Sequence, residues 1–306
     1  MQAARPVARV SGAAALGRCA VCDGMSSHVV WRENGYEGRA CACGTVYTTP
    51  PPALDAVDPT ADAHPDSYYA APAPRRARWI RRHHAGRRLL EIGCGEGHFL
   101  AAAQAAGYLV AGIEPEPGRA RRAAARLGAP VECALLESCR VRPGQFDVVY
   151  HCDLLSHFAD PVAALRKMAA FLAAGGVVAF EVGLLGGIAP WWYTMAGSIG
   201  YPQHRWLFSV ASLRRLLRRA DLELGRTAHF GLAPEALFRG AMRGLARRYR
   251  DLRATPQLRP GARVSASRVL DQTESFWRYT VGQLAPRVGP ATLFAIAHPR
   301  GQGSRP

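Results

Sequence analysis

Three glycines at alternate positions follow a short apolar run in the stretch LLEIGCGEGHFL, which covers residues 89–100. The apolar run is typical of a buried strand, and the residues after Gly97 are typical of the start of a helix. Gly93, Gly95 and Gly97 are therefore expected in a strand-to-helix turn. Because glycine has no side chain, such a turn lets a ligand approach the backbone closely. The spacing predicts a ligand-binding turn.

The acidic residues around this turn favour a ligand without phosphate groups. A dinucleotide fingerprint would have a third glycine where His98 stands, and the chain has no G-x-x-x-x-G-K-[ST] phosphate loop. Glu91 and Glu96 would repel a pyrophosphate at the start of the helix, so a cationic cofactor fits better. Glu114 ends the next apolar run, YLVAGIE, where a carboxylate can accept hydrogen bonds from both hydroxyls of a ribose. A tight glycine turn with two solvated acids is the alternative.

Four of the eight cysteines form two close pairs near the start of the chain. Cys19 and Cys22 are spaced Cys-x-x-Cys, and Cys41 and Cys43 are spaced Cys-x-Cys and precede Gly44. Two such turns, joined by a small hairpin, can present four thiolates to zinc in a tetrahedron. The shorter second pair leaves unrelated free thiols as the alternative.

The sequence predicts three consecutive parts: a cysteine module, a linker and a larger domain. Residues 15–50 are expected to form a zinc-ribbon-like module, and residues 51–74, rich in Pro, Ala and Asp, a linker. From residue 75 to 300, apolar strand and helix patterns alternate, which predicts an α/β domain with a doubly wound parallel sheet. Helices are expected at 75–85, 97–106, 116–127, 160–173 and 209–220, and strands at 88–92, 108–113, 130–133, 146–151, 176–182, 221–230 and 291–299. A helical insert is expected at 234–285. Such a sheet binds its ligand at the carboxyl ends of its strands.

The glycine turn, the segment GIEP at 112–115 and the stretch FDVVYHCDLLSHFADPVAALRKMAAFLAAGG at 146–176 resemble class I S-adenosylmethionine-dependent methyltransferases. The resemblance covers residues 88–230. It implies a Rossmann-like sheet of seven strands in the order 3-2-1-4-5-7-6, with the last strand antiparallel, and S-adenosylmethionine as the cofactor. Carried over by position, it implies that the amino-acid end of the cofactor is lined by Glu91, Gly93, Gly95 and Gly97, its ribose is held by Glu114, and its adenine is flanked by Ala134 and Leu135.

The cysteine module is similar to the zinc-binding extension that precedes the methyltransferase domain in many bacterial small-molecule methyltransferases. In those proteins the second pair is usually Cys-x-x-Cys-Gly, so this chain departs from them at Ala40 and Cys41. The similarity implies one structural zinc ion, bound by Cys19, Cys22, Cys41 and Cys43.

The residues that would act on the acceptor follow the fourth and fifth strands of the expected sheet. Tyr201-Pro-Gln-His204 is similar to the Tyr-x-x-His segment of zinc-containing deoxysugar C-methyltransferases, in which tyrosine and histidine serve as bases. The same family implies a role for His157. In quinone O-methyltransferases and metal-dependent relatives a glutamate precedes this histidine. This chain has Ser156 there, so no catalytic divalent metal is expected. Each histidine could instead have a structural role.

We therefore expect a methyltransferase that acts on a small metabolite, anionic or carrier-linked, with O-methylation in bacterial secondary or cell-envelope metabolism as the leading interpretation. Methylation of carbon or nitrogen on a nucleotide-linked sugar remains open, as does RNA methylation with the zinc module binding the RNA. The net charge of +16 would suit a nucleic acid. However, nearly all of the basic charge is arginine, Lys167 is the only lysine, and the arginines scatter over several expected helices, which argues against a nucleic-acid partner.

The sequence also gives expectations for the location of the protein and for its assembly. The chain has no apolar run long enough to span a membrane. The apolar part of its N-terminal stretch is short, broken by glycine and followed directly by the cysteine module, so we read no signal peptide and expect a cytoplasmic protein. A homodimer could form through the insert at 234–285.

Overall fold

The computed structural model describes residues 17–53, 66–196, 199–231, 272, 275–276, 278–284 and 289–301. Most of the insert expected at 234–285 lies outside the described residues, and so does the dimer contact expected there. Residues 54–65 of the expected linker also lie outside them.

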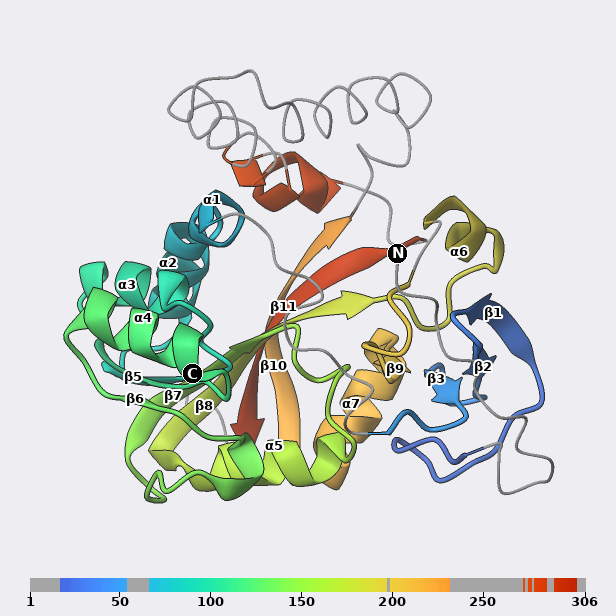
Figure 1. The fold of residues 1–306 in the computed structure, drawn as a ribbon, viewed down its shortest axis with the longest axis horizontal. Coiled ribbons are helices and arrows are strands. Elements are labelled where there is room, and N and C mark those ends of the chain that lie inside the picture. Colours follow the sequence, from blue (N-terminus) through green and yellow to red (C-terminus); the bar gives the residue numbers. More distant parts are fainter. Residues whose placement is uncertain are drawn as a thin grey trace.

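In the part of the chain that the structure describes, seven strands form a central sheet in the order β6-β5-β4-β7-β8-β11-β10 (Figure 1). The strands are β4 (Arg88–Ile92), β5 (Leu109–Ile113), β6 (Val131–Glu132), β7 (Phe146–Cys152), β8 (Leu172–Leu184), β10 (Leu222–Gly231) and β11 (Ala291–Pro299). The pairs from β6 to β8 are parallel, and β11 is antiparallel to both β8 and β10. Counted along the chain, this order is 3-2-1-4-5-7-6, so the expected doubly wound sheet is confirmed.

Helices cover both faces of this sheet and give it a three-layer arrangement (Figure 1). The helices are α1 (Asp66–Ala70), α2 (Ala73–His83), α3 (His98–Ala105), α4 (Pro117–Leu127), α5 (Pro161–Ala170), α6 (Trp191–Ala196) and α7 (Val210–Arg219), with short 3₁₀ helices at Leu136–Ser138 and Val281–Leu284. Apolar side chains of α2, α3 and α4 pack on one face, and those of α5 and α7 on the other. None of the described helices is long and apolar enough to cross a membrane.

The period-two pattern of the central strands divides the core between these two layers. In β8, Val178 and Phe180 face the α5 and α7 side, whereas Val177 and Ala179 face the α2 and α3 side. Because both faces are covered, the strand is apolar almost throughout, as parallel strands usually are. The carboxyl ends of β4, β5, β7 and β8 are thereby held in one rigid row.

A second, smaller sheet connects the cysteine module to the main domain. It contains β1 (Val29–Glu33), β2 (Tyr36–Ala40), β3 (Val46–Thr49) and β9 (Trp206–Leu207) in that order. Strand β9 belongs to the chain that follows β8, and it pairs antiparallel with β3. The guanidinium group of Arg205 adds hydrogen bonds to the carbonyl oxygens of Pro52 (2.7 Å) and Ala53 (3.1 Å). The module is therefore fixed to the segment between β8 and α7.

Candidate active site

The glycine turn lies between the carboxyl end of β4 and the start of α3, at the centre of the sheet. Gly93 and Gly95 have φ angles of 68° and 54°, which lie in the left-handed region that favours glycine. A Cβ atom at Gly93 would lie 2.7 Å from Cδ1 of Leu154, whereas one at Gly95 would meet no atom within 4 Å. The turn is thus closely packed at Gly93 and open at Gly95. The space next to Gly95 is where a ligand can approach the backbone.

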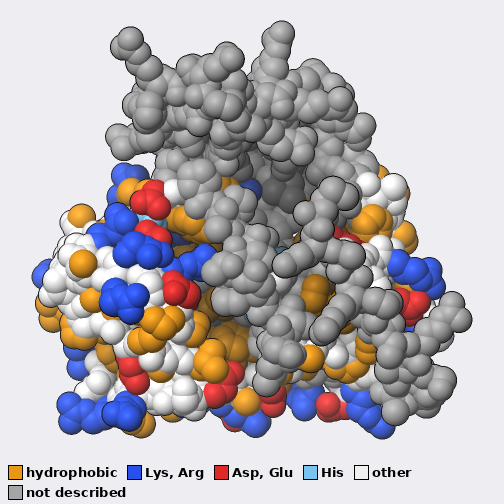
Figure 2. Space-filling view, in the orientation of Figure 1, with side chains coloured by type: hydrophobic (Ala, Val, Ile, Leu, Met, Phe, Trp, Pro, Cys, Tyr) orange, Lys and Arg blue, Asp and Glu red, His pale blue; other side chains and the backbone are white. Residues whose placement is uncertain are grey.

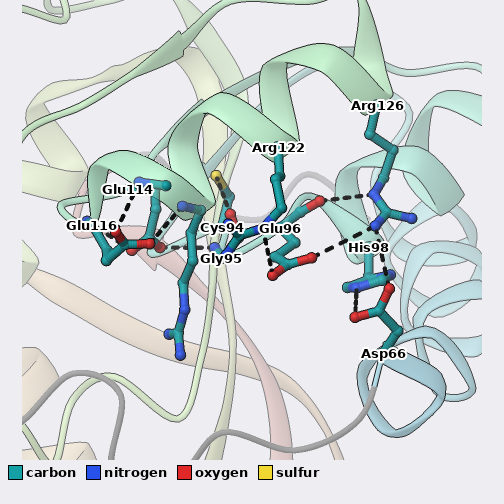
Figure 3. A network of polar contacts seen from close by, with 11 residues as sticks. Asp66, Cys94, Gly95, Glu96, His98, Glu114, Glu116, Arg122 and Arg126 are labelled. Atoms are coloured by element: carbon teal, nitrogen blue, oxygen red, sulfur yellow. Dashed lines mark hydrogen bonds and ion pairs between the residues drawn. The ribbon is translucent and has the colours of Figure 1, made fainter.

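Glu114 follows β5 and holds this turn in place (Figure 3). Its side chain is buried, with one carboxylate oxygen accepting the Gly95 N–H at 2.8 Å and the other accepting the Glu116 N–H at 3.0 Å. A carboxylate has about four lone-pair sites, so two remain for further donors. Glu114 can therefore support the turn and accept hydrogen bonds from a ribose at the same time.

Glu96 has a different environment, although it is part of the same turn (Figure 3). Its carboxylate pairs with Arg122 at 2.8 Å and with Arg126 at 3.8 Å, both from α4. Asp66 of α1 lies 3.6 Å from both His98 and Arg126, so α1 is held against the start of α3. Burial lowers the pKa of His98, as does the nearby Arg126 charge. Because Glu96 is neutralised by arginine, Glu91 and Glu114 are the two acidic side chains left at the ligand side of the turn.

Glu91 is buried in β4, with only 5% of its surface exposed. Its Oε2 atom has no hydrogen-bond partner among the described residues. Burial raises the pKa of this carboxyl well above its usual range; the nearby Glu114 raises it further, and the Arg76 charge opposes both. An unpaired buried acceptor of this kind is costly and is expected to have a partner in the working protein. The amino group of an amino-acid ligand would be such a partner.

The residues expected to flank an adenine follow β6, on the far side of Glu114 from the glycine turn. Ala134 is partly buried, and Leu135 has 59% of its surface exposed. An exposed leucine can cover one face of a planar ring and bury apolar area in doing so. With the open space at Gly95, the acceptor capacity of Glu114 and the unpaired oxygen of Glu91, the residues present fit S-adenosylmethionine.

A buried charged cluster beside Glu91 was not expected from the sequence. Glu181 of β8 accepts two hydrogen bonds from Arg76 of α2, both at 2.8 Å, and two contacts of 2.7 Å from the Tyr279 hydroxyl. Burial alone would raise the pKa of Glu181, but the Arg76 charge and these hydrogen bonds outweigh it and lower the pKa. The cluster ties α2 and the chain before β11 to the centre of the sheet. In the sequence, this cluster is indicated by Glu181, which lies inside an apolar strand.

Two of the three expected acceptor-side residues lie together beyond the ends of β7 and β8. The rings of His157 and His204 have centroids 4.8 Å apart. Nδ1 of His157 lies 2.9 Å from the carbonyl oxygen of Gln203, and Nδ1 of His204 lies 3.0 Å from Oγ of Ser156. Leu154, whose side chain lies against Gly93, is in the same short turn as His157, whose N–H donates to the Leu154 carbonyl oxygen at 2.9 Å. The turn that carries His157 thus adjoins the glycine turn.

The third residue, Tyr201, does not lie with this pair. Its side chain has only 2% of its surface exposed and packs in the small-sheet cluster that includes Val46 and Leu207. A Cβ atom at Gly38 of β2 would collide with the Tyr201 hydroxyl, so the hydroxyl points to the cysteine module. Burial raises the pKa of this phenol above its usual value. Tyr201 makes no hydrogen bond to either histidine within the described part of the chain, and its predicted role as a base stays a prediction.

The four cysteines of the module come together as their spacing predicts. Their Sγ atoms all lie within 4.8 Å of one another, with Cys19 and Cys43 at 3.6 Å and Cys22 and Cys41 at 3.3 Å. Zinc–sulfur bonds of about 2.3 Å in a tetrahedron place the sulfurs about 3.8 Å apart. The donor set therefore has the chemistry and the separations that a structural zinc site requires.

A sheet in the order 3-2-1-4-5-7-6, with a glycine turn after its first strand and a carboxylate after its second, defines a class I S-adenosylmethionine-dependent methyltransferase. The chain belongs to the methyltransferase-domain family, whose model matches residues 65–226. The class and the cofactor implied by the sequence resemblance are thereby confirmed.

The chain is also similar to individual proteins, in sequence or in fold. The chain is 32% identical over 116 residues to a ubiquinone biosynthesis O-methyltransferase of Thiobacillus denitrificans, covering 35% of this chain and 50% of the relative. It is 36% identical over 115 residues to the same-named protein of Pseudomonas aeruginosa, covering 34% of this chain and 49% of the relative. The chain thus spans about half the length of these relatives. A crystal structure of the MccD protein shares the fold, with a TM-score of 0.51, 12% identity and coverage of 74% of this chain and 96% of that one.

Proposed function

We propose that the protein transfers the methyl group of S-adenosylmethionine to a hydroxyl oxygen of a small metabolite. The observation that supports this proposal is the pair of His157 and His204, whose rings lie 4.8 Å apart in the segments that follow β7 and β8. A hydroxyl must lose a proton as it is methylated, and imidazole is the side chain best suited to accept one near neutral pH. The names of the relatives, which are O-methyltransferases of ubiquinone biosynthesis, support transfer to oxygen.

One set of residues in the proposed site would hold the cofactor, and another would act on the acceptor. When bound, S-adenosylmethionine supplies an electrophilic methyl group on a sulfonium. Its amino-acid end would be held by Glu91, Gly93, Gly95 and Gly97, its ribose by Glu114, and its adenine by Ala134 and Leu135. On the acceptor side, Nε2 of His204 takes the proton of the hydroxyl while the oxygen gains the methyl group. Holding the two reactants in line supplies much of the rate.

The segment between β8 and His204 also suits a planar or aromatic acceptor. Trp191 and Trp192 of α6 stack with ring centroids 4.1 Å apart, and Trp191 has 52% of its surface exposed. A partly exposed pair of indoles offers a flat apolar wall with a polar edge. We propose that this wall borders the acceptor, which is anionic or carrier-linked and belongs to bacterial secondary or cell-envelope metabolism.

The other two functions considered from the sequence have less support. Sugar C-methylation with Tyr201 and His204 as paired bases would need both side chains at the acceptor, but the Tyr201 hydroxyl is buried against Gly38. RNA binding by the module would need a free basic surface, but Arg32 and Arg39 both pair with Glu37. On the face shown in Figure 2, basic side chains lie in separate groups among acidic and apolar ones.

A panel of acceptors tests the proposed function directly. The purified chain with S-adenosylmethionine should release S-adenosylhomocysteine in the presence of small hydroxylated compounds, including phenols and hydroxy acids, and NMR of the product should show an O-methyl group. Nucleotide-linked sugars and a folded RNA serve as competing acceptors in the same assay. Methyl groups found only on carbon, nitrogen or RNA would contradict the proposal.

We also propose that the module binds one structural zinc ion through Cys19, Cys22, Cys41 and Cys43. Native mass spectrometry should find one zinc per chain, and Cys22→Ser should lose it because three thiolates no longer close the tetrahedron. Cys133→Ser is the matched control, since Cys133 is exposed and lies outside the module. A metal-free protein whose four module cysteines all react with a thiol reagent in the folded state would show that they are ordinary thiols.

A further inference from the structure

Ser156 lies in the turn after β7, between the two parts of the candidate site. Its side chain has only 4% of its surface exposed, and its carbonyl oxygen accepts the Arg205 N–H at 2.7 Å. Its hydroxyl contacts two groups, Nδ1 of His204 at 3.0 Å and the carbonyl oxygen of Asp153 at 3.3 Å. A buried serine held between a histidine and a backbone carbonyl is placed to control the hydrogen on that histidine.

One arrangement of the hydrogens satisfies both contacts of the Ser156 hydroxyl. A serine hydroxyl has one hydrogen to donate, and a carbonyl oxygen can only accept. If the Ser156 hydroxyl gives its hydrogen to the Asp153 carbonyl, its oxygen accepts from His204, and Nδ1 of His204 then carries the hydrogen. In a neutral imidazole the other nitrogen, Nε2, is then the acceptor with a free lone pair.

We propose that Ser156 is a positioning residue that holds His204 in the tautomer with hydrogen on Nδ1 and a basic Nε2. The inference rests on the proposed function, in which Nε2 of His204 takes the proton of the acceptor hydroxyl. It also gives a role to the position where the resemblance to quinone O-methyltransferases would place a glutamate.

Glycine at position 200 leaves space beside Nε2 of His204. Nε2 has no hydrogen-bond partner among the described residues. A Cβ atom at Gly200 would lie 3.2 Å from Cδ2 and 3.6 Å from Nε2 of the ring, so the glycine keeps this edge uncovered. Gly200 has a φ of 77°, a conformation that disfavours other residues there.

The backbone of His204 is fixed independently of Ser156. Its carbonyl oxygen accepts the Thr48 hydroxyl at 2.8 Å, and its N–H donates to Gly200 at 3.2 Å. Removing the hydroxyl of Ser156 should therefore leave the ring near its place and free only its tautomer. His157 provides an internal reference, because its Nδ1 faces the Gln203 carbonyl and must carry the hydrogen whatever residue stands at 156.

The test is the tautomer itself, read by ¹⁵N NMR on the full chain labelled in its histidines. The signals of His204 are assigned by their loss in His204→Gln. In the unmodified protein, His204 should show a protonated Nδ1 and an unprotonated Nε2. In Ser156→Ala the two nitrogens should move toward averaged shifts, while His157 stays unchanged. Ser156→Thr keeps a hydroxyl and should restore the original pattern.

Turnover should follow the tautomer. Ser156→Ala should lower kcat by about 10–100-fold, the range for losing a hydrogen-bond partner that orients a metal-binding histidine, with the affinity for S-adenosylhomocysteine unchanged. Ser156→Thr should recover most of the loss. A His204 that carries its hydrogen on Nε2, or a pattern that Ser156→Ala leaves unaltered, would overturn the role of Ser156 and leave the proposed function standing. Wild-type turnover in His204→Gln would instead overturn the role of His204 in the proposed function.

Discussion

Gly95→Arg should abolish the binding of both S-adenosylmethionine and S-adenosylhomocysteine. A side chain at this position extends into the space where no protein atom lies within 4 Å of an added Cβ, which is the space assigned to the cofactor. The φ of 54° also disfavours any residue with a Cβ. Isothermal titration of the purified protein should show saturable binding for the natural sequence and none for the variant.

Gly144→Arg is the matched control for this substitution. Gly144 also has a positive φ, 73°, and a Cβ added there also meets no atom within 4 Å. It precedes β7, however, and so lies at the amino ends of the parallel strands, away from the site. The same charge and the same backbone strain should leave cofactor affinity intact. Equal losses in the two variants would mean that the fold, and not the site, had been damaged.

The same titration, applied to Glu114→Ala and Glu96→Ala, distinguishes the roles of the two acidic residues near the turn. Glu114→Ala should weaken binding by about 1–3 kcal/mol, because the ribose hydroxyls and the Gly95 N–H lose their acceptor. Glu96→Ala should change affinity little, because its carboxylate pairs with Arg122 on the outer side of the turn. Unchanged affinity in both Gly95→Arg and Glu114→Ala would remove the assignment of this turn to the cofactor.

The central sheet was predictable because its strands are short, continuous apolar runs with clear breaks. Strands β4 and β11 begin and end at the expected residues, 88–92 and 291–299. Strand β8 is longer than expected, because it begins at Leu172, opposite Phe146 of β7, in a segment whose alanines and glycines give no strand signal. Strand β9 could not be found at all. Its two residues form a strand only because β3, far away in the sequence, pairs with them.

In the candidate site, too, local sequence predicts some features, whereas others depend on residues far away in the chain. The residues proposed to hold the cofactor could be named from the sequence because they lie at the ends of consecutive strands, and the strand pattern gives their positions in the sheet. The orientation of Tyr201 depends on Gly38 in the module, and the cluster of Arg76, Glu181 and Tyr279 joins three distant segments. A charged residue in an apolar strand indicates that a partner exists, but the sequence does not name the partner. Long-range packing decides these contacts.

His204→Ala should lower turnover by about 10²–10⁴-fold, the usual contribution of a positioned general base. Cofactor affinity should barely change, because no described contact joins His204 to the glycine turn or to Glu114. His28→Ala is the control, since His28 is exposed on the cysteine module and should leave turnover unaltered.

The pH dependence of the His204 variant tests whether His204 acts as the general base. A neutral imidazole can accept a proton and a protonated one cannot, so a histidine base gives the plot of kcat against pH an acidic limb. The residual activity of His204→Ala should lack this acidic limb, because the group that produces it is gone. Comparison of kcat against pH for the two proteins, with saturating cofactor, measures the difference. If the variant kept wild-type turnover, or lost only cofactor binding, His204 would have a structural role. The neighbouring His157, whose ring lies 4.8 Å away, would then be the residue to test as the base.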